Sequence, residues 1–237
     1  MEKLMTYETL RNFAYCNDKI TKTPFRGIVL SFFGLNGRDM YDEDTELGKL
    51  YAEKGILLVV PYNNPWAWMN RQAVAYTDEL IDVLMEHYHL PETLPIVSTG
   101  GSMGGLSCLV YTVYAGRTPT ACAANCPVCD LPYHYTERPD LPRTLLSAFG
   151  EYSMPLEEAM KTASPLHIVD KMPDIPYYIV HCEADQAVNK QLHSDRFVAR
   201  LSENHRVIYK SVPDRGHCDL TPEAAEELKA FILKYAK

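Results

Sequence analysis

Long apolar runs are missing from this sequence. No stretch approaches the ~20 apolar residues that a transmembrane helix needs. The first twenty residues carry charges of both signs, among them Arg11, Asp18 and Lys19, and contain no apolar core of the kind that marks a signal peptide. We therefore expect a protein without a membrane segment that is located in the cytoplasm.

Basic clusters are missing as well. The chain has 23 Lys and Arg against 31 Asp and Glu, which gives a formal net charge of −8. A nucleic-acid-binding face needs clustered cations, so we expect no nucleic-acid partner. The sequence also lacks internal repeats and low-complexity segments. Its 237 residues, 46% of them apolar, fit one α/β domain over residues 1–237.

The cysteines do not form a recognisable metal or disulfide framework. There are seven, an odd number spread along the chain, which predicts reduced thiols. Cys126 and Cys129 form a C-x-x-C pair, and Cys122 lies four residues before it. No second such pair or nearby pair of histidines completes a zinc site. We interpret these cysteines as small buried apolar residues and predict no metal site.

What the sequence does contain is an alternation of apolar runs and amphipathic stretches. We predict buried strands at 27–33, 56–60, 95–98, 120–125, 177–182 and 206–212, with a weaker strand within 10–20. Helices are predicted at 42–54, 69–88, 106–114 and 189–202, with a last helix that opens at Thr221 and Pro222. This order favours an α/β fold with a mainly parallel sheet and helices on both faces.

Residues 130–165 interrupt this alternation. The segment is rich in proline and aromatic residues and has weak periodicity. We interpret it as a small cap insertion with one or two short helices, placed over the site.

The turn after the predicted strand 95–98 carries a candidate nucleophile. Gly100 and Gly104 lie two residues on either side of Ser102, which is the G-x-S-x-G spacing of a nucleophile elbow. Small residues are needed there because a side chain would collide with the backbone of so sharp a turn. Ser102 would then expose its hydroxyl at the tip of the turn, and the amide of Met103 would lie at a helix N-terminus.

A serine hydroxyl needs a base and a carboxylate that orients the base. In a parallel sheet these partners come from loops after later strands. Asp185 follows the strand 177–182 and is our preferred carboxylate; Glu183 and, less strongly, Asp130 remain alternatives. His217 follows the last strand and is the predicted base, with Gly216 expected to let the backbone turn the imidazole inward.

Two further groups complete the predicted site. The loop after the first long strand is expected to supply a second oxyanion amide, from Leu35, beside that of Met103. Aromatic residues at the same edge could form the walls of an acyl or aromatic pocket, or pack beneath the insertion. These candidate substrate-binding residues are Phe33, Tyr62, Trp66 and Trp68.

The segments FFGLNGRD, GGSMGG, HCEADQAV and PDRGHCD occur in the order serine, aspartate, histidine that α/β-hydrolases use. Over residues 20–237 the chain resembles small single-domain α/β-hydrolases related to the prolyl oligopeptidase catalytic domain and to dienelactone hydrolases. The resemblance implies ester or amide hydrolysis through an acyl-enzyme, with no metal or organic cofactor. Ser102, Asp185 and His217 match the triad, and Leu35 and Met103 match the oxyanion donors.

The resemblance has two departures. Many relatives have histidine before the glycine of the oxyanion loop, where this chain has Phe33, and oligopeptidases of the group often use a tyrosine hydroxyl there. The chain also lacks their large N-terminal propeller. We therefore predict a carboxylesterase for small acyl or aromatic esters. A peptidase or aminoacyl hydrolase is the alternative, and a catalytically silent binding module is a third; a homodimer stays open.

Overall fold

The apolar runs of the sequence form the centre of a parallel sheet. A computed structural model describes residues 5–237; residues 1–4, the start of the segment examined for a signal peptide, lie outside the described part. The described strands form one seven-stranded sheet in the order β1-β3-β2-β4-β5-β6-β7, in which only β1 is antiparallel to its neighbour. The strands are β1 (Ala14–Cys16), β2 (Gly27–Phe32), β3 (Ile56–Pro61), β4 (Ile96–Gly101), β5 (Ala121–Asn125), β6 (Tyr177–Cys182) and β7 (Val207–Val212).

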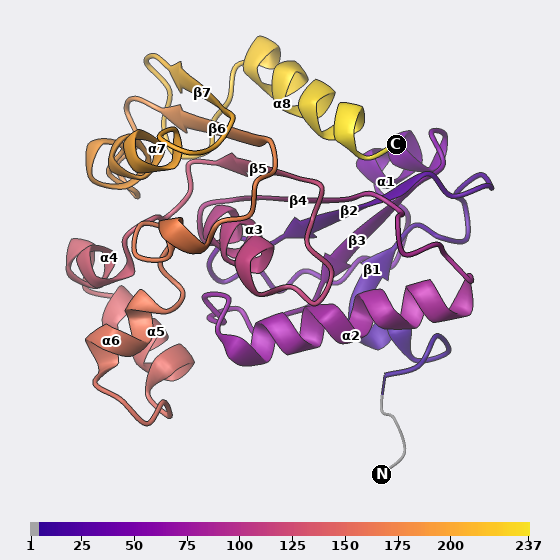
Figure 1. The fold of residues 1–237 in the computed structure, drawn as a ribbon, viewed down its shortest axis with the longest axis horizontal. Coiled ribbons are helices and arrows are strands. Elements are labelled where there is room, and N and C mark those ends of the chain that lie inside the picture. The colour runs from indigo at the N-terminus through magenta and orange to yellow at the C-terminus, as the bar shows by residue number, and fades with distance from the viewer. Residues whose placement is uncertain (1–4) are drawn as a thin grey trace.

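Helices cover both faces of this sheet (Figure 1). One apolar core lies between the sheet and α2, α3 and α7, and the other lies between the sheet and α1 and α8. Neighbouring residues of a strand, such as Ile28 and Val29, enter opposite cores because side chains alternate along a strand. The helices are α1 (Glu46–Ala52), α2 (Arg71–His87), α3 (Met103–Tyr114), α4 (Leu131–Glu137), α5 (Leu141–Phe149), α6 (Leu156–Lys161), α7 (Arg196–Leu201) and α8 (Pro222–Tyr235).

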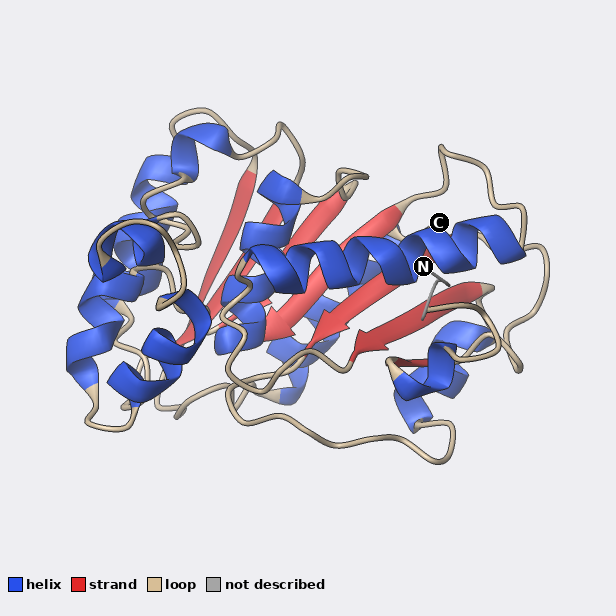
Figure 2. Ribbon diagram, turned by 90° about the horizontal axis from the view of Figure 1, so that it is seen from below, coloured by secondary structure: helices blue, strands red, loops and turns tan. Residues whose placement is uncertain are grey.

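Figure 2 shows α2 running across the sheet as the longest helix on its face. Its N-cap Asn70 accepts a hydrogen bond from the Ala73 amide at 3.0 Å. The last helix is capped as its sequence predicts, since Thr221 accepts a hydrogen bond from the amide of Ala224. These caps fix where α2 and α8 begin, and the apolar faces of the two helices fix how they lie on the sheet.

Four predicted elements differ from the structure. The weak strand within 10–20 is a 3₁₀ turn (Leu10–Asn12) followed by the three residues of β1. The polar helix predicted at 42–54 begins only at Glu46, after its N-cap Thr45. The helix predicted at 189–202 starts as a π-helical turn (Gln191–Asp195) that leads into α7. The segment 130–165 contains three short helices rather than one or two.

The helices α4, α5 and α6 form a group at one side of the sheet (Figure 1). Trp68, in the loop after β3, donates a hydrogen bond from Nε1 to Thr144 of α5 at 3.0 Å. Asn70 donates to the Ala148 carbonyl at 2.9 Å. The helical group is therefore attached to the loop that leaves the carboxyl end of β3.

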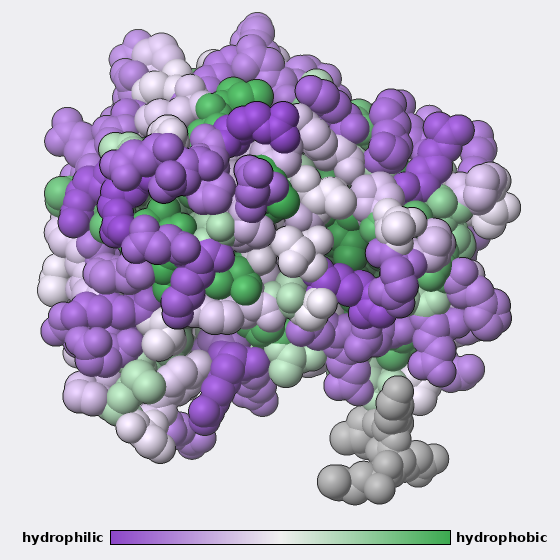
Figure 3. Space-filling view, in the orientation of Figure 1, coloured by the Kyte–Doolittle hydropathy of each residue, from purple (hydrophilic) through white to green (hydrophobic). Residues whose placement is uncertain are grey.

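The surface in the view of Figure 3 is mostly hydrophilic, with apolar residues in small separate patches. Within residues 5–237, no helix combines the length and the apolar character needed to cross a membrane.

Candidate active site

Ser102 lies between β4 and α3, at a turn with an unusual backbone. Its φ of 60° and ψ of −124° fall where residues with a side chain are strained. The turn is held because the Ser102 amide donates to the Asn125 carbonyl at 2.9 Å, while the Ser102 carbonyl accepts from Leu106 at 3.1 Å. This is the strand–turn–helix context that a nucleophile elbow requires.

The two glycines of the motif are required by close backbone contacts. A Cβ on Gly100 would lie 2.4 Å from the Gly104 carbonyl oxygen, and one on Gly104 would lie 2.2 Å from the Phe32 carbonyl oxygen. Both distances are shorter than any real contact of a Cβ. The spacing of the motif therefore follows from the tight packing of β2, β4 and α3 at the turn.

Asp185 lies in the loop after β6 and is held by four donors. Its Oδ1 accepts from the amides of Ala187 and Val188 at 2.8 and 3.0 Å. Its Oδ2 accepts from His217 Nδ1 at 2.6 Å and lies 3.2 Å from His181 Nε2. Burial acts to raise the pKa of Asp185, but these hydrogen bonds lower it well below the ordinary value. The carboxylate is therefore charged and fixed in orientation.

His217 lies in the loop after β7, with its ring partly exposed. Burial acts to lower the pKa of His217, but the hydrogen bond and the charge of Asp185 raise it above the ordinary histidine value. The turn that directs the ring inward does not depend on Gly216, which has ordinary φ. The residues with positive φ are Asp214 (56°) and Cys218 (57°), on either side of the glycine.

Ser102 and His217 line one cavity of about 500 Å³ at the carboxyl edge of the sheet. His217 lies against Asp185, whereas within residues 5–237 no hydrogen bond joins the Ser102 hydroxyl to His217. Such bonds are often long in the absence of substrate and shorten when it binds. The structure thus brings Ser102, Asp185 and His217 to one edge of the sheet, without a hydrogen bond between the serine and the histidine.

The loop after β2 passes beside the nucleophile. A Cβ on Gly34 would lie 3.8 Å from Ser102 Cβ, and Leu35 lines the same cavity. In the described part of the chain, neither the Leu35 amide nor the Met103 amide donates a hydrogen bond to another protein group. Neither amide therefore has an acceptor within the described chain that would compete with a bound oxygen.

The four predicted pocket aromatics divide into two groups. Phe33 and Trp68 line the cavity with Ser102, and Trp68 also packs beneath the helical group through its bond to Thr144. Tyr62 and Trp66 lie elsewhere. The Tyr62 hydroxyl accepts from the Tyr41 amide at 3.0 Å, and the Trp66 indole donates to Asn36 at 2.7 Å. Both hydrogen bonds connect the loop after β3 to the segment after β2, and neither side chain lines the cavity.

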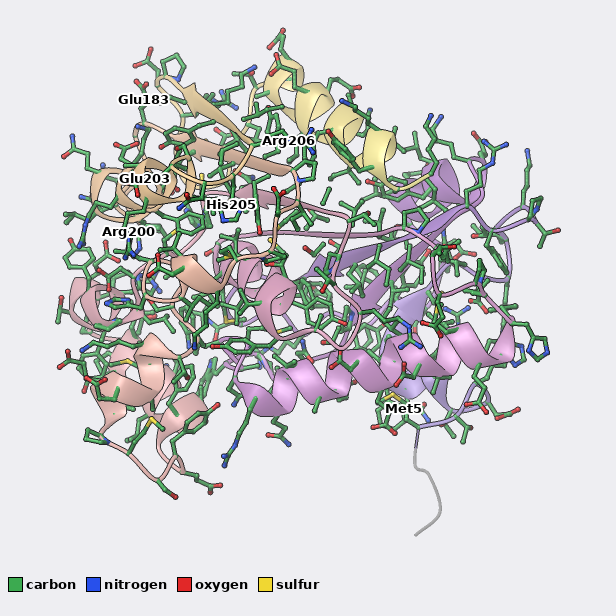
Figure 4. All side chains as sticks on the ribbon, in the orientation of Figure 1. Met5, Glu183, Arg200, Glu203, His205 and Arg206 are labelled. Atoms are coloured by element: carbon green, nitrogen blue, oxygen red, sulfur yellow. The ribbon has the colours of Figure 1, made fainter. Side chains whose placement is uncertain are left out.

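The two alternative carboxylates have other partners. Glu183 accepts a hydrogen bond from Ser211 of β7 at 2.6 Å and lies at the periphery of the molecule (Figure 4). Asp130 caps α4 by accepting from the Tyr133 amide and pairs with Arg196 at 3.1 Å. Neither carboxylate contacts His217.

His134, Arg138, Val188 and Cys218 also line this cavity and were not predicted as site residues; the first two belong to the helical group. His134 Nδ1 is hydrogen-bonded to Glu137, which also accepts from His193 Nε2 at 2.8 Å. Burial acts to raise the pKa of Glu137, but the two histidines lower it to about 2. Burial lowers the pKa of His134. No short motif marks His134, Arg138 and Val188, because they reach the cavity from segments distant from Ser102 along the chain.

Two clusters of potential metal ligands are occupied by hydrogen bonds. In the cluster of His134, Glu137 and His193, the His193 Nδ1 accepts from the amides of Cys129 and Asp130 at 3.0 and 3.1 Å. Its Nε2 therefore carries the hydrogen that it donates to Glu137, so this nitrogen has no free lone pair for a metal.

The second cluster joins His181 and Asp185 to Cys126. His181 Nε2 lies 3.1 Å from the Val188 carbonyl, an acceptor, so this nitrogen is protonated too. His181 Nδ1 faces the Ser194 hydroxyl at 2.6 Å. A third cluster joins His217 to Cys126 and Cys218.

Comparison with known proteins agrees with this geometry. Residues 72–237 match the Prolyl oligopeptidase family. No curated protein sequence matches the chain.

Solved structures share the fold at low sequence identity. A puromycin-hydrolyzing peptidase from Mycobacterium tuberculosis matches with a TM-score of 0.68 at 18% identity, over 91% of this chain and 34% of its own. Esterase B from Lactobacillus rhamnosis matches with a TM-score of 0.68 at 13% identity, over 91% and 76% of the two chains.

A third similar structure, an S-formylglutathione hydrolase from Agrobacterium tumefaciens, has a TM-score of 0.65 at 14% identity, over 90% of this chain and 82% of its own. The chain thus spans about a third of the length of the peptidase but most of the length of the two smaller enzymes. The fold is that of the α/β-hydrolases, and the chain belongs to the prolyl oligopeptidase family.

Proposed function

We propose that this protein is a carboxylesterase that cleaves small acyl or aromatic esters through an acyl-enzyme on Ser102. The observation that carries the proposal is the 2.6 Å hydrogen bond between His217 and Asp185 beside a strained serine that lines the same cavity. In this mechanism His217 Nε2 takes the Ser102 proton as the hydroxyl attacks the ester carbonyl. It then gives that proton to the leaving alcohol, and a water repeats the sequence to release the acid.

Asp185 keeps His217 in the tautomer that this proton transfer needs. Its Oδ2 accepts from Nδ1, so Nδ1 carries a hydrogen and Nε2 presents its lone pair. The fixed negative charge then stabilises the imidazolium that forms when the serine attacks.

The amides of Leu35 and Met103 are the proposed oxyanion donors. Each lies beside Ser102 in the chain or in space and has no acceptor among residues 5–237. Met103 is also the first residue of α3, where the helix dipole favours negative charge. Removing one oxyanion donor from a serine protease costs roughly 10²–10³-fold in turnover, so two amides account for much of the expected rate.

The cavity supports an ester of modest size. Its volume of about 500 Å³ lies within the range of small-molecule sites, and apolar residues such as Phe33, Leu35 and Trp68 line it. The second candidate is a peptidase or aminoacyl hydrolase. Membership of the prolyl oligopeptidase family and the puromycin-hydrolyzing peptidase among similar folds favour that candidate.

Short p-nitrophenyl esters test the proposal directly. We expect wild-type turnover and a loss of about 10⁴-fold or more in Ser102→Ala. The matched control is Ser107→Ala, five residues along α3, whose hydroxyl bonds only to the Met103 carbonyl at 2.9 Å. Equal activity in wild type and Ser102→Ala would reject Ser102 as the nucleophile.

Two further reagents separate the alternatives. Aminoacyl- and peptidyl-coumarins are expected to turn over far more slowly than the esters, and the reverse order would establish the peptidase. A fluorophosphonate probe should label folded wild type and leave Ser102→Ala unlabelled. Absence of labelling together with absence of turnover would favour a binding module without catalysis.

A further inference from the structure

Two cysteine thiols lie beside the ring nitrogen of His217 that faces away from Asp185. Cys218 Sγ lies 3.8 Å from His217 Nε2. Cys126, directly after β5, belongs to the same cluster, in which one ligand atom from each of the three residues lies within 4.8 Å of the others. These groups come from two distant segments of the chain, and the proposed reaction uses neither thiol.

The geometry is close to that of a metal site. Typical bond lengths are about 2.3 Å for Zn–S and about 2.0 Å for Zn–N, and tetrahedral coordination then places sulfur and nitrogen ligands roughly 3.5 Å apart. The 3.8 Å between Cys218 Sγ and His217 Nε2 is near this value. Two cysteines and one histidine with an open fourth position are also a known ligand set for zinc in enzymes.

The hydrogen-bond partners and the exposure of the three ligand atoms bear on whether they can bind a cation. His217 Nε2 presents its lone pair because Nδ1 donates to Asp185. Cys126 Sγ accepts hydrogen bonds from the amides of Cys182 and Cys218, both at 3.4 Å. The neighbouring Cys218 thiol and burial raise the pKa of the Cys126 thiol, so a bound cation has to displace its proton. Cys218 lines the cavity that contains Ser102, so a cation has a route to the site.

The backbone at both cysteines is unusual. Cys126 has a φ of 43° and Cys218 a φ of 57°, in the left-handed region that residues with a Cβ enter at a cost of roughly 1–2 kcal/mol. Beside them, Asn125 Oδ1 is buried with no hydrogen-bond partner within residues 5–237. Strained backbone and an unpaired polar atom gather at functional sites more often than in ordinary packing.

We propose that Cys126, His217 and Cys218 bind a thiophilic divalent cation such as Zn²⁺, which reversibly inhibits the hydrolase. Binding releases the two thiol protons to solvent, and the metal occupies the Nε2 lone pair. His217 then cannot accept the Ser102 proton, so the acyl-enzyme does not form. Binding itself is independent of the proposed ester hydrolysis, whereas the inhibition rests on it.

Binding is tested on the Ser102→Ala protein, which needs no turnover. Titration with Cd²⁺ should produce thiolate-to-cadmium absorption in the ultraviolet that saturates at one equivalent, and Zn²⁺ should remove it by competition. Loss of even an outer partner of a metal site lowers affinity about 10–100-fold, so Cys126→Ser and Cys218→Ser should each weaken binding at least that much. Cys16→Ala, at a buried cysteine of β1 on the other side of the sheet, is the matched control and should bind as the parent does.

Inhibition is tested on the enzyme with its active serine. Saturating Zn²⁺ should lower ester hydrolysis by about tenfold or more, and a chelator should restore it. The response of each cysteine variant is measured against its own metal-free rate, and both Cys126→Ser and Cys218→Ser should need at least tenfold more Zn²⁺. If Cys126→Ser does not fold by circular dichroism, Cys218→Ser and the cadmium absorption decide.

Three results would overturn the proposal: no cadmium–thiolate absorption, binding that is unchanged in Cys218→Ser, or full activity at Zn²⁺ concentrations that saturate the site. An inactive wild-type protein that still binds one Cd²⁺ through the thiols would instead reject the ester hydrolase and retain the metal site.

Discussion

His181 Nε2 lies 3.2 Å from Oδ2 of Asp185, the same carboxylate oxygen that accepts the hydrogen bond from His217. His181 lies within β6 and is fully buried, and its other ring nitrogen faces Ser194 at 2.6 Å. The strand therefore holds the carboxylate from one side while the two amides of its own loop hold it from the other. We infer that His181 positions the Asp185 carboxylate against the proposed base, His217.

Replacing His181 tests this positioning. We expect His181→Phe to lower kcat by about 10- to 100-fold with little change in KM. The Asp185 carboxylate loses one of its donors, so His217 is positioned less well, whereas substrate binding is unaffected. Steady-state kinetics with a p-nitrophenyl ester measure both constants. His205→Gln, just before β7 and so at the opposite edge of the sheet, is the control and should retain both values. A change in KM alone would contradict the positioning role.

The pH dependence of activity follows from the raised pKa of His217. The base must be neutral to accept the serine proton, so kcat/KM should rise as the pH increases through a pKa above the ordinary value of about 6.5. In Asp185→Asn the rise should move to lower pH, because the carboxylate that raises the pKa is gone.

The kcat of Asp185→Asn is a second measurement, independent of the pH profile. Replacing the triad aspartate by asparagine lowers kcat by roughly 10⁴-fold in a serine protease, and we expect a large loss in Asp185→Asn as well. Glu183→Gln is the matched control, two residues away and bonded to Ser211, and should be near normal. A normal rate in Asp185→Asn with a loss in Glu183→Gln would assign the acid to Glu183 instead.

Stability at the elbow should depend on Gly104. In Gly104→Ala the new Cβ would lie 2.2 Å from the Phe32 carbonyl oxygen, so we expect a loss of about 1–3 kcal/mol or more in the free energy of unfolding. Gly216→Ala has no atom within 4 Å of the added Cβ and ordinary φ, so its unfolding free energy should change by less than about 0.5 kcal/mol. Denaturant unfolding of both variants measures the difference, and equal values would contradict the crowding at Gly104.

The pKa of Glu137 predicts a pH-dependent contribution to folding. Its folded value of about 2 lies below the ordinary 4.5, so its stabilisation is fully present above pH 4.5 and is lost as the pH falls toward 2. We expect Glu137→Gln to lose about 1–3 kcal/mol at pH 7, because buried donors of His134 and His193 lose a charged acceptor.

The difference between wild type and Glu137→Gln should shrink when unfolding is measured at pH 4 and below. Glu157→Gln, which removes an exposed partner of Lys161, serves as the control and should leave the free energy of unfolding nearly unchanged at every pH. A difference that stays constant with pH would show that the network does not depend on the charge of Glu137.

Much of the architecture could be predicted from local sequence. Apolar runs such as residues 27–32 and 56–60 are strands because they are covered on both faces, and Thr221 with Pro222 starts α8 because both suit the first turn of a helix. The ends of the elements were less predictable. The helix predicted from residue 42 begins only at Glu46, since residues 42–45 are polar and have no apolar side chain to hold them on the sheet.

The candidate site divides in the same way. Ser102 and its two glycines form one short segment whose spacing alone specifies the turn, so the sequence by itself determined the nucleophile elbow. Only the tertiary structure distinguishes Asp185 from Glu183, since it places the carboxylate of Asp185 against His217 and that of Glu183 against Ser211. It also brought His134 of α4 and the thiol of Cys126 to this edge. Contacts between segments distant along the chain are set by packing, which no local pattern encodes.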